Sequence, residues 1–152
     1  MKKQLFLLAV LLGLSTMVSH KMVAQEYKTG VGLRFAYYTP GLSINHFINP
    51  NTDIEGIISS KYGLDYILTG LYKKHKPLDW GIEELSWYYG GGAHLGSAVS
   101  LPIVGIDGVV GLEYVFKDIP VAVSLDASPF VDVLPEFRVS MDVGLGIHYI
   151  FK

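Results

Sequence analysis

The chain has 152 residues, of which 50% are apolar and 17% charged, with 17 glycines and no cysteine. This length fits one domain, and the charged fraction lies well below the roughly 25% that is usual for a soluble domain. The lack of cysteine excludes a disulfide scaffold, thiolate zinc sites and cysteine nucleophiles. The net charge of −2, with one short basic run, argues against a nucleic-acid surface.

The first 24 residues have the pattern of a secretory signal peptide. Lys2 and Lys3 form a positive start, residues 5–14 (LFLLAVLLGL) are apolar, and small residues lead to a cleavage point after Ala24. The apolar run is shorter than the ~20 residues of a membrane-spanning helix, which disfavours an uncleaved anchor. We therefore expect residues 25–152 to form the exported domain, with nine Lys and Arg, fourteen Asp and Glu, and a net charge of −5.

Beyond residue 24 the hydropathy pattern has a period of two, which indicates β-strands. Residues 85–106 lack Asp, Glu, Lys and Arg, but they contain too many glycines and prolines for a membrane helix. In chain order, the alternation predicts strands at 30–38, 41–48, 53–59, 64–73, 85–96, 104–116, 121–128 and 138–151. Turn-forming residues separate them, at 39–41, 49–51, 61–63, 74–84, 97–102, 117–120 and 129–136.

The last predicted strand shows the alternation most clearly. From Val139 to Phe151 every odd position is apolar, and the even positions are polar or small apart from Ile150. A strand of this length is far longer than the 5–6 residues common in globular proteins. It exceeds the roughly 9–11 residues that a membrane-spanning strand requires.

The polar faces of these strands carry few charges and many glycines. In a soluble barrel the apolar face points inward, whereas an outer-membrane barrel has the opposite arrangement. Small residues suit the crowded interior of a narrow barrel, and a wide apolar face suits lipid. The sequence therefore predicts an all-β fold, an eight-stranded antiparallel up-and-down transmembrane β-barrel, whose interior charge network comprises Arg34, Glu55, Asp65, Lys73, Asp107, Glu113, Asp126, Arg138 and Asp142.

Charges inside a closed barrel must pair with one another. We expect Arg34 and Arg138 each to contact at least two of the interior carboxylates. Because the first and last strands meet at closure, the expected contacts include an Arg34–Asp142 pair or a network centred on Arg138.

Aromatic residues on the apolar face gather at one end of the predicted strands. Amphipathic rings favour the membrane interface, so we expect a girdle at the periplasmic side. Its members are Tyr72, Trp87, Tyr89, Tyr114, Phe116, Tyr149 and Phe151.

The C-terminal strand, ending in GIHYIF (residues 146–151), resembles the assembly signal of Gram-negative outer-membrane proteins, with Leu145, Ile147, Tyr149 and Phe151 as its alternate apolar positions. Residues 27–152 as a whole resemble the small outer-membrane β-barrel proteins of porin-like, OmpA/OmpX type. The segments TGLYKKHKP (69–77), WYYGGGAHLG (87–96) and residues 105–129 look closest to one branch of that group. The resemblance implies a place in the cell outer membrane, contact with its lipid, and secretion and barrel-assembly machinery as partners during biogenesis, with a monomer as the expected state.

Two histidines are candidates for chemistry: His94 with Ser97 or Ser100, and His148 with Asp142. The second pair would lie about 20 Å apart along one strand, so it cannot form a dyad there. No G-x-S-x-G, H-E-x-x-H or P-loop motif occurs. We interpret His94 as a hydrogen-bonded interior histidine and predict no enzyme activity, no cofactor and no metal.

The predicted function is therefore that of a structural or surface protein without an open pore, because side chains fill a barrel of eight strands. Two alternatives stay open at this point. One is a soluble periplasmic or secreted lipid-binding β-barrel. The other is an outer-membrane lipid-modifying enzyme that uses His94.

Overall fold

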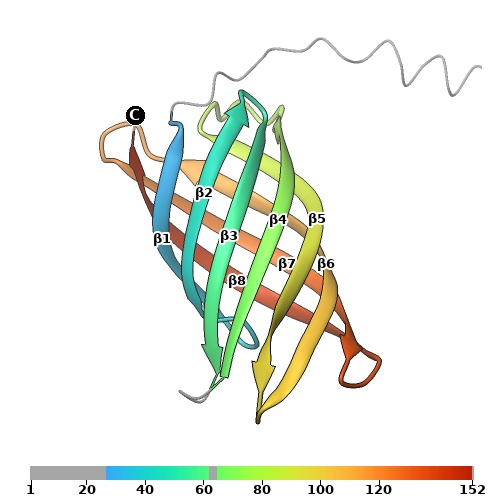
Figure 1. Cartoon of the computed structure of the whole chain (residues 1–152). Coiled ribbons are helices and arrows are strands. Elements are labelled where there is room, and N and C mark those ends of the chain that lie inside the picture. Colours follow the sequence, from blue (N-terminus) through green and yellow to red (C-terminus); the bar gives the residue numbers. More distant parts are fainter. Residues whose placement is uncertain (1–26, 62–64, 152) are drawn as a thin grey trace, which may run out of the picture.

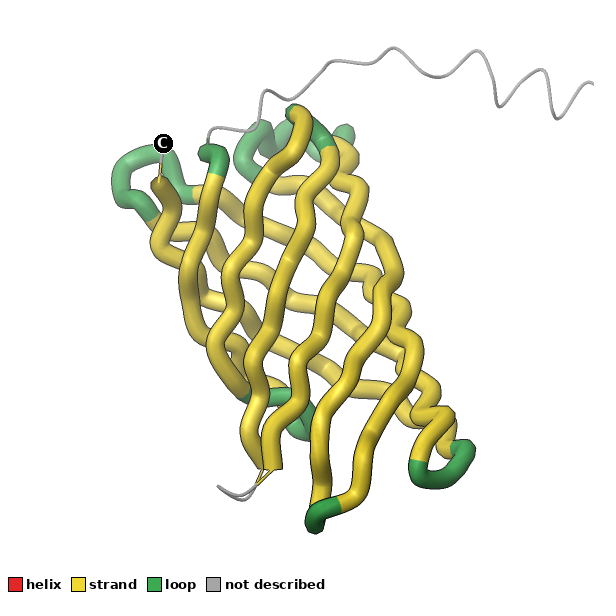
Figure 2. The backbone as a smooth tube through the Cα atoms, in the orientation of Figure 1, coloured by secondary structure: helices red, strands yellow, loops and turns green. Residues whose placement is uncertain are grey.

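The computed structural model describes residues 27–61 and 65–151, which form one closed antiparallel β-barrel (Figures 1 and 2). Each strand pairs with its neighbours in sequence, and β1 pairs with β8 to close the sheet. The strands are β1 (Thr29–Ala36), β2 (Gly41–Asn49), β3 (Thr52–Lys61), β4 (Asp65–Pro77), β5 (Leu85–Ala98), β6 (Leu101–Val115), β7 (Val121–Leu134) and β8 (Arg138–Phe151). The eight-stranded up-and-down topology confirms the prediction. The predicted signal peptide, residues 1–24, lies outside the described residues.

The barrel has two unlike ends. At the proximal end lie the start of β1, the end of β8 and the connections β2–β3, β4–β5 and β6–β7 (Figure 1). At the distal end lie the turns β1–β2, β5–β6 and β7–β8. Among the described residues, no helix is long and apolar enough to cross a membrane.

Three strands extend beyond a predicted end by three residues or more. β4 continues to Pro77, β7 continues to Leu134, and β6 begins at Leu101. The predicted loop 97–102 shrinks to Val99 and Ser100, which both have positive φ, as a tight hairpin turn requires. Pro129 is accommodated within β7 because the register leaves it without a partner on β6, so its missing N–H removes no ladder bond there.

Side chains alternate between the two faces of the wall, with apolar groups outward. Along β8, Asp142 and His148 are buried while Val143, Leu145 and Tyr149 are exposed. The same period of two recurs in β2, β3 and β4. Within the described strands, most polar side chains therefore lie inside the wall and most large apolar side chains lie outside it.

Two apolar clusters divide the interior into layers. The proximal cluster closes the end near the termini and comprises Tyr27, Phe47, Val115, Ala122 and Ile150. The second cluster lies deeper in the barrel and comprises Ile57, Leu71, Tyr88 and Val109. Polar groups occupy the spaces between and beyond these layers, so the fold fixes where ionised side chains can meet.

Candidate functional site: the ionised interior and the outer face

The centre of the barrel holds a bidentate ion pair between Arg34 and Asp126. Arg34 Nη1 and Nη2 donate to the two carboxylate oxygens of Asp126 at 2.7 and 2.6 Å. The same carboxylate accepts the Tyr88 hydroxyl at 2.9 Å and the Ser128 hydroxyl at 3.0 Å. Because a buried charge is stable only when it is paired and hydrogen-bonded, these four contacts make Asp126 the anchor of the central layer.

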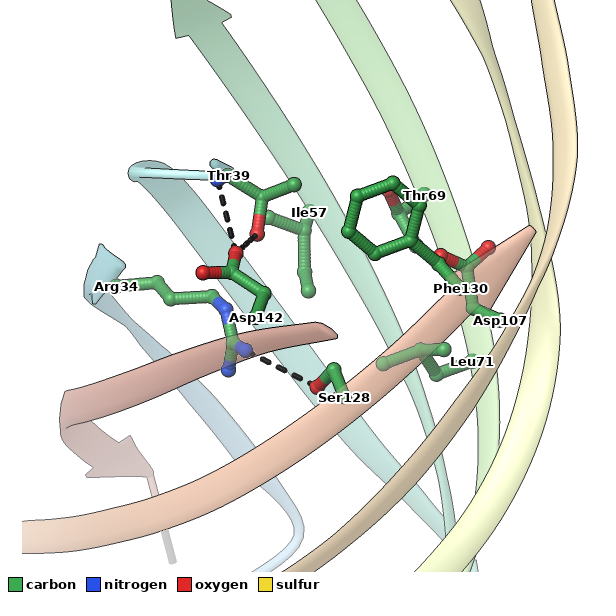
Figure 3. Close-up of a pocket in the computed structure, with 9 residues that line it drawn as sticks. All are labelled: Arg34, Thr39, Ile57, Thr69, Leu71, Asp107, Ser128, Phe130 and Asp142. Atoms are coloured by element: carbon green, nitrogen blue, oxygen red, sulfur yellow. Dashed lines mark hydrogen bonds between the residues drawn. The ribbon is translucent and has the colours of Figure 1, made fainter. Parts of the chain in front are cut away.

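The prediction that Arg34 contacts at least two interior carboxylates is wrong within the described part of the chain. Its remaining contact is the Ser128 hydroxyl at 3.3 Å. Asp142 instead accepts the backbone N–H groups of Tyr37, Tyr38 and Thr39 at 3.0–3.1 Å, together with the Thr39 hydroxyl at 2.7 Å. Figure 3 shows Asp142 turned toward Thr39 and Arg34 reaching toward Ser128. Backbone donors of the β1–β2 turn therefore replace the guanidinium as the partner of Asp142.

On the proximal side of the central ion pair, the buried cation is Lys73. Its ammonium lies 2.7 Å from Glu55 Oε2 and 3.2 Å from Asp53 Oδ2, and all three side chains are buried. Glu55 also accepts the Ser43 hydroxyl. The ammonium lies 4.6 Å from the centre of the Tyr88 ring, which adds a cation–π contact.

A second proximal group surrounds Glu113, which is fully buried. Tyr27 donates its hydroxyl to Glu113 at 3.0 Å and accepts the Asn45 side-chain amide at 3.0 Å. His75 Nδ1 lies 3.8 Å from Glu113 Oε1 and His75 Nε2 lies 3.1 Å from Asp53 Oδ1, so His75 joins this group to the Asp53–Lys73 pair. The proximal polar residues therefore form one continuous network between the two apolar clusters.

Sequence analysis missed Asp53 and His75 as interior residues. Asp53 begins the predicted strand 53–59, and His75 falls in the predicted turn 74–84. In the structure the inward face of β4 includes both Lys73 and His75. All four residues 73–76 are basic, so the sequence has no alternation of polarity that would have extended the strand.

At the distal end, oppositely charged groups form a row. His94 Nδ1 lies 2.9 Å from Asp107 Oδ2, and His94 Nε2 lies 3.0 Å from Asp132 Oδ1. Arg138 donates to Asp132 Oδ2 through Nε at 3.0 Å and Nη2 at 2.7 Å. Each ring nitrogen of His94 faces a carboxylate, an arrangement that favours the imidazolium, in which both nitrogens donate.

The prediction for Arg138 is wrong. Its carboxylate partner is Asp132, which the sequence analysis placed in a loop, and 62% of its side chain is exposed. Because β7 continues to Leu134, Asp132 faces inward in register with Arg138. Asp65, the remaining interior acid, accepts the backbone N–H of Val99 at 2.8 Å.

Neither candidate catalytic pair is assembled. His94 contacts Asp107 and Asp132, and its hydrogen bonds in the described structure include neither Ser97 nor Ser100. His148 Nε2 lies 3.0 Å from the Ser43 hydroxyl, far along the strand from Asp142. The prediction of His94 as a hydrogen-bonded interior histidine is confirmed by this geometry.

Two cavities lie on the distal side. The larger has a volume of about 120 Å³. Its lining includes the charged residues His94, Asp107, Asp132 and Arg138, together with Tyr38, Asp65 and Phe130. The smaller, about 20 Å³, lies beside Arg34, Asp142 and Leu71 (Figure 3). A volume of this size holds about one water molecule.

The predicted girdle residues all lie on the outward face near the proximal end. Three pairs are in ring contact, with centroids 5.3 Å apart for Trp87–Tyr89, 4.9 Å for Tyr114–Phe116 and 5.0 Å for Tyr149–Phe151. The outward face of β8 carries Leu145, Ile147, Tyr149 and Phe151. These are the four alternate apolar positions in which the C-terminal strand resembles the assembly signal. Tyr72, the remaining predicted girdle residue, points outward from β4 and is 47% exposed.

Comparisons with known proteins identify the fold. No family model matches the chain, and no curated protein matches it in sequence. The N-terminal β-barrel domain of Pseudomonas aeruginosa OprF is similar in structure, with a TM-score of 0.60, 13% identity, and coverage of 80% of this chain and 96% of that one. Neisserial surface protein A (NspA) has a TM-score of 0.56 at 11% identity, covering 81% of this chain and 94% of that one. The chain therefore has the closed eight-stranded fold of small outer-membrane barrels of the OmpA/OmpX type.

Proposed function

We propose that this protein is an integral outer-membrane β-barrel with a side-chain-filled interior and a structural or surface role. The observation that carries the proposal is the inverted wall: exposed aliphatic residues cover the outside while ionised residues pair within. Lipid demands both an apolar outer surface and a fully paired backbone, which a closed barrel supplies. A soluble barrel would instead present this apolar surface to water.

In the proposed orientation the proximal end faces the periplasm and the distal turns face outward. The predicted signal peptide, residues 1–24, directs export, and residues 25–152 form the barrel. The C-terminal residues Leu145, Ile147, Tyr149 and Phe151 guide assembly by the barrel-assembly machinery. A closed sheet leaves no edge strand for pairing with another copy, which supports a monomer.

We propose that the barrel interior contains no open path through which ions could pass. The proximal cluster closes one end, and the second cluster crosses the barrel with Tyr88 and Leu71 buried at 1% and 3% exposure. Continuous ion pairs fill the spaces between these layers. Purified protein in a planar lipid bilayer is expected to show no steady conductance, and regular open-channel steps would contradict the proposed filled interior.

Cell fractionation tests the location most directly. We expect the mature chain in the outer-membrane fraction, extraction only with detergent, and faster gel migration before heating than after it, as folded barrels show. Protease added to intact cells is expected to reach the distal turns alone. Recovery from the soluble periplasmic fraction without detergent would favour the lipid-binding alternative instead.

The proposal includes the absence of enzyme activity. Both ring nitrogens of His94 are engaged by carboxylates, so the ring has no free position from which to accept a proton from a nucleophile. An acyl-transfer assay with phospholipid and lipid A substrates is expected to give equal background rates for wild type and His94→Ala. Activity that the variant loses while its barrel stays folded would establish the enzyme alternative.

A further inference from the structure

Within the described side chains of the strands, the outward face of the barrel carries charge at one place. Among strand residues whose side chains the structure describes, the charged ones that point outward are Lys74 and Lys76 on β4. Their neighbours Lys73 and His75 are 3% exposed and point inward, which fixes the opposite direction for this pair. Two like charges near the end of an otherwise apolar wall attract an anionic group from outside the protein.

Aromatic rings border both lysines. The β4–β5 register places Lys74 opposite Tyr89 and Lys76 opposite Trp87. The Lys76 ammonium lies 5.9 Å from the centre of the Trp87 ring and 5.6 Å from that of Tyr89. The two rings are stacked, with centroids 5.3 Å apart and planes 30° apart. The ammonium group is therefore held at the girdle, where hydrocarbon gives way to headgroups in the proposed membrane.

Two of the three acids in the β4–β5 connection, Glu83 and Glu84, are already engaged by a different lysine. Lys117 lies 2.6 Å from Glu84 and 3.4 Å from Glu83, and its hydrogen bond lowers the pKa of the Glu84 carboxyl. Within residues 27–61 and 65–151, neither Lys74 nor Lys76 forms an ion pair with an acidic side chain. Their charges are thus available to an external anion at the proximal rim.

We propose that Lys74, Lys76, Trp87 and Tyr89 form a binding site for the phosphodiester headgroup of an anionic phospholipid. The two ammonium groups bind the phosphate, and the stacked rings contact the glycerol and the first methylenes of the acyl chains. The aliphatic stems of the lysines lie along the apolar wall while their charged ends reach the headgroup layer. This inference rests on the proposed membrane location.

Trp87 supplies a local probe for the test. The chain has 2 tryptophans, and Trp80, which is 71% exposed in the β4–β5 connection, is replaced in a Trp80→Phe background. The full mature chain is reconstituted in phosphatidylcholine vesicles that contain a small fixed fraction of brominated lipid, either phosphatidylglycerol or phosphatidylcholine. Bromine on the acyl chains quenches Trp87 fluorescence on contact, so the ratio of the two quenching levels measures the local enrichment of anionic lipid.

We expect phosphatidylglycerol to be enriched at Trp87 by roughly 25-fold, because each of the two lysines contributes a factor of about five near an anionic surface. The enrichment should fall to about onefold in the Lys74→Gln/Lys76→Gln variant, and 1 M salt should reduce it because screening then acts within about 3 Å. Lys117→Gln is the matched control, since it removes one lysine at the same end whose charge is already paired with Glu84.

The outcomes separate this inference from the proposal on which it rests. Equal quenching by both lipids in the wild type, or undiminished enrichment in the double variant, would overturn the lipid site while leaving the barrel in the membrane. An equal loss of enrichment in Lys117→Gln would show that bulk charge acts in place of this site. The absence of quenching by either brominated lipid would overturn the membrane location, and the lipid site with it.

Discussion

The guanidinium of Arg34 occupies the space that a side chain at residue 144 would fill. A Cβ built on Gly144 would lie 2.4 Å from both Arg34 Cζ and Arg34 Nη2. The two residues belong to the neighbouring strands β1 and β8, where the barrel closes. The lack of a side chain at residue 144 is therefore what allows Arg34 to reach Asp126 across the interior.

Gly144→Ala is expected to destabilise the barrel by about 1–3 kcal/mol, because the added methyl group must displace a guanidinium held by three hydrogen bonds. Urea titration of the protein in lipid vesicles, followed by tryptophan fluorescence, measures the free energy of unfolding. Gly70→Ala is the control, since a Cβ at Gly70 would meet nothing within 4 Å. Equal stability of the two variants would contradict this account of Gly144.

Asp126→Asn removes the negative charge that pairs with buried Arg34. The same carboxylate accepts hydrogen bonds from the Tyr88 and Ser128 hydroxyl groups. Leaving a buried cation without its partner costs about 3–5 kcal/mol, so the variant is expected to lose its compact, fast-migrating form at a lower temperature. Asp118→Asn, at an exposed position in the β6–β7 connection, should migrate as the wild type does. A melting profile of Asp126→Asn that matches the wild type would rule out the central pair as a stabilising element.

The His94 ring is expected to carry protons on both nitrogens at neutral pH, because each nitrogen faces a carboxylate. Nitrogen NMR of protein labelled at histidine distinguishes the imidazolium from the two neutral forms. His46 lies on the exposed face of β2 and gives a reference signal. A neutral His94 ring at pH 7 would be incompatible with the proposed row of charges.

Phe47→Ala should cost about 3–5 kcal/mol, because it leaves a cavity in the proximal cluster. Phe47 contacts the rings of Tyr27 and His75 at centroid distances of 5.2 and 5.0 Å. Ile48→Ala changes the next, outward-facing residue and is expected to cost far less. Conductance should stay absent in both variants, since the second cluster is intact, and a new open channel in Phe47→Ala would show that the proximal cluster alone seals the barrel.

The alternation of single residues was sufficient to predict the strands and their inner and outer faces. Every strand with a clear period of two appears in the structure, because the two faces meet environments of opposite polarity. Strand ends were predicted less well, since Pro129 and the basic run at residues 73–76 have the composition of turns. A barrel wall continues past such residues wherever the neighbouring strand still offers a partner.

The partners within the interior could not be predicted from the sequence. Arg34 and Asp126 are separated by 92 positions, and their meeting depends on the stagger of all the strands between them. A shift of one residue in any strand turns its side chains to the other face. Asp126 was therefore among the interior carboxylates predicted for Arg34, but the second carboxylate for Arg34 and the Asp132 partner of Arg138 were not predicted correctly.

The wall is not equally tall around the barrel. β1 has 8 residues and β2 has 9, whereas β6 has 15, and the β5–β6 and β7–β8 hairpins project past the β1–β2 turn (Figure 1). A bilayer of uniform thickness cannot match both the short and the tall side. In the proposed outer membrane this mismatch is relieved when the cylinder leans or the lipid thins beside β1 and β2, so the protein would deform the leaflet unevenly around its circumference.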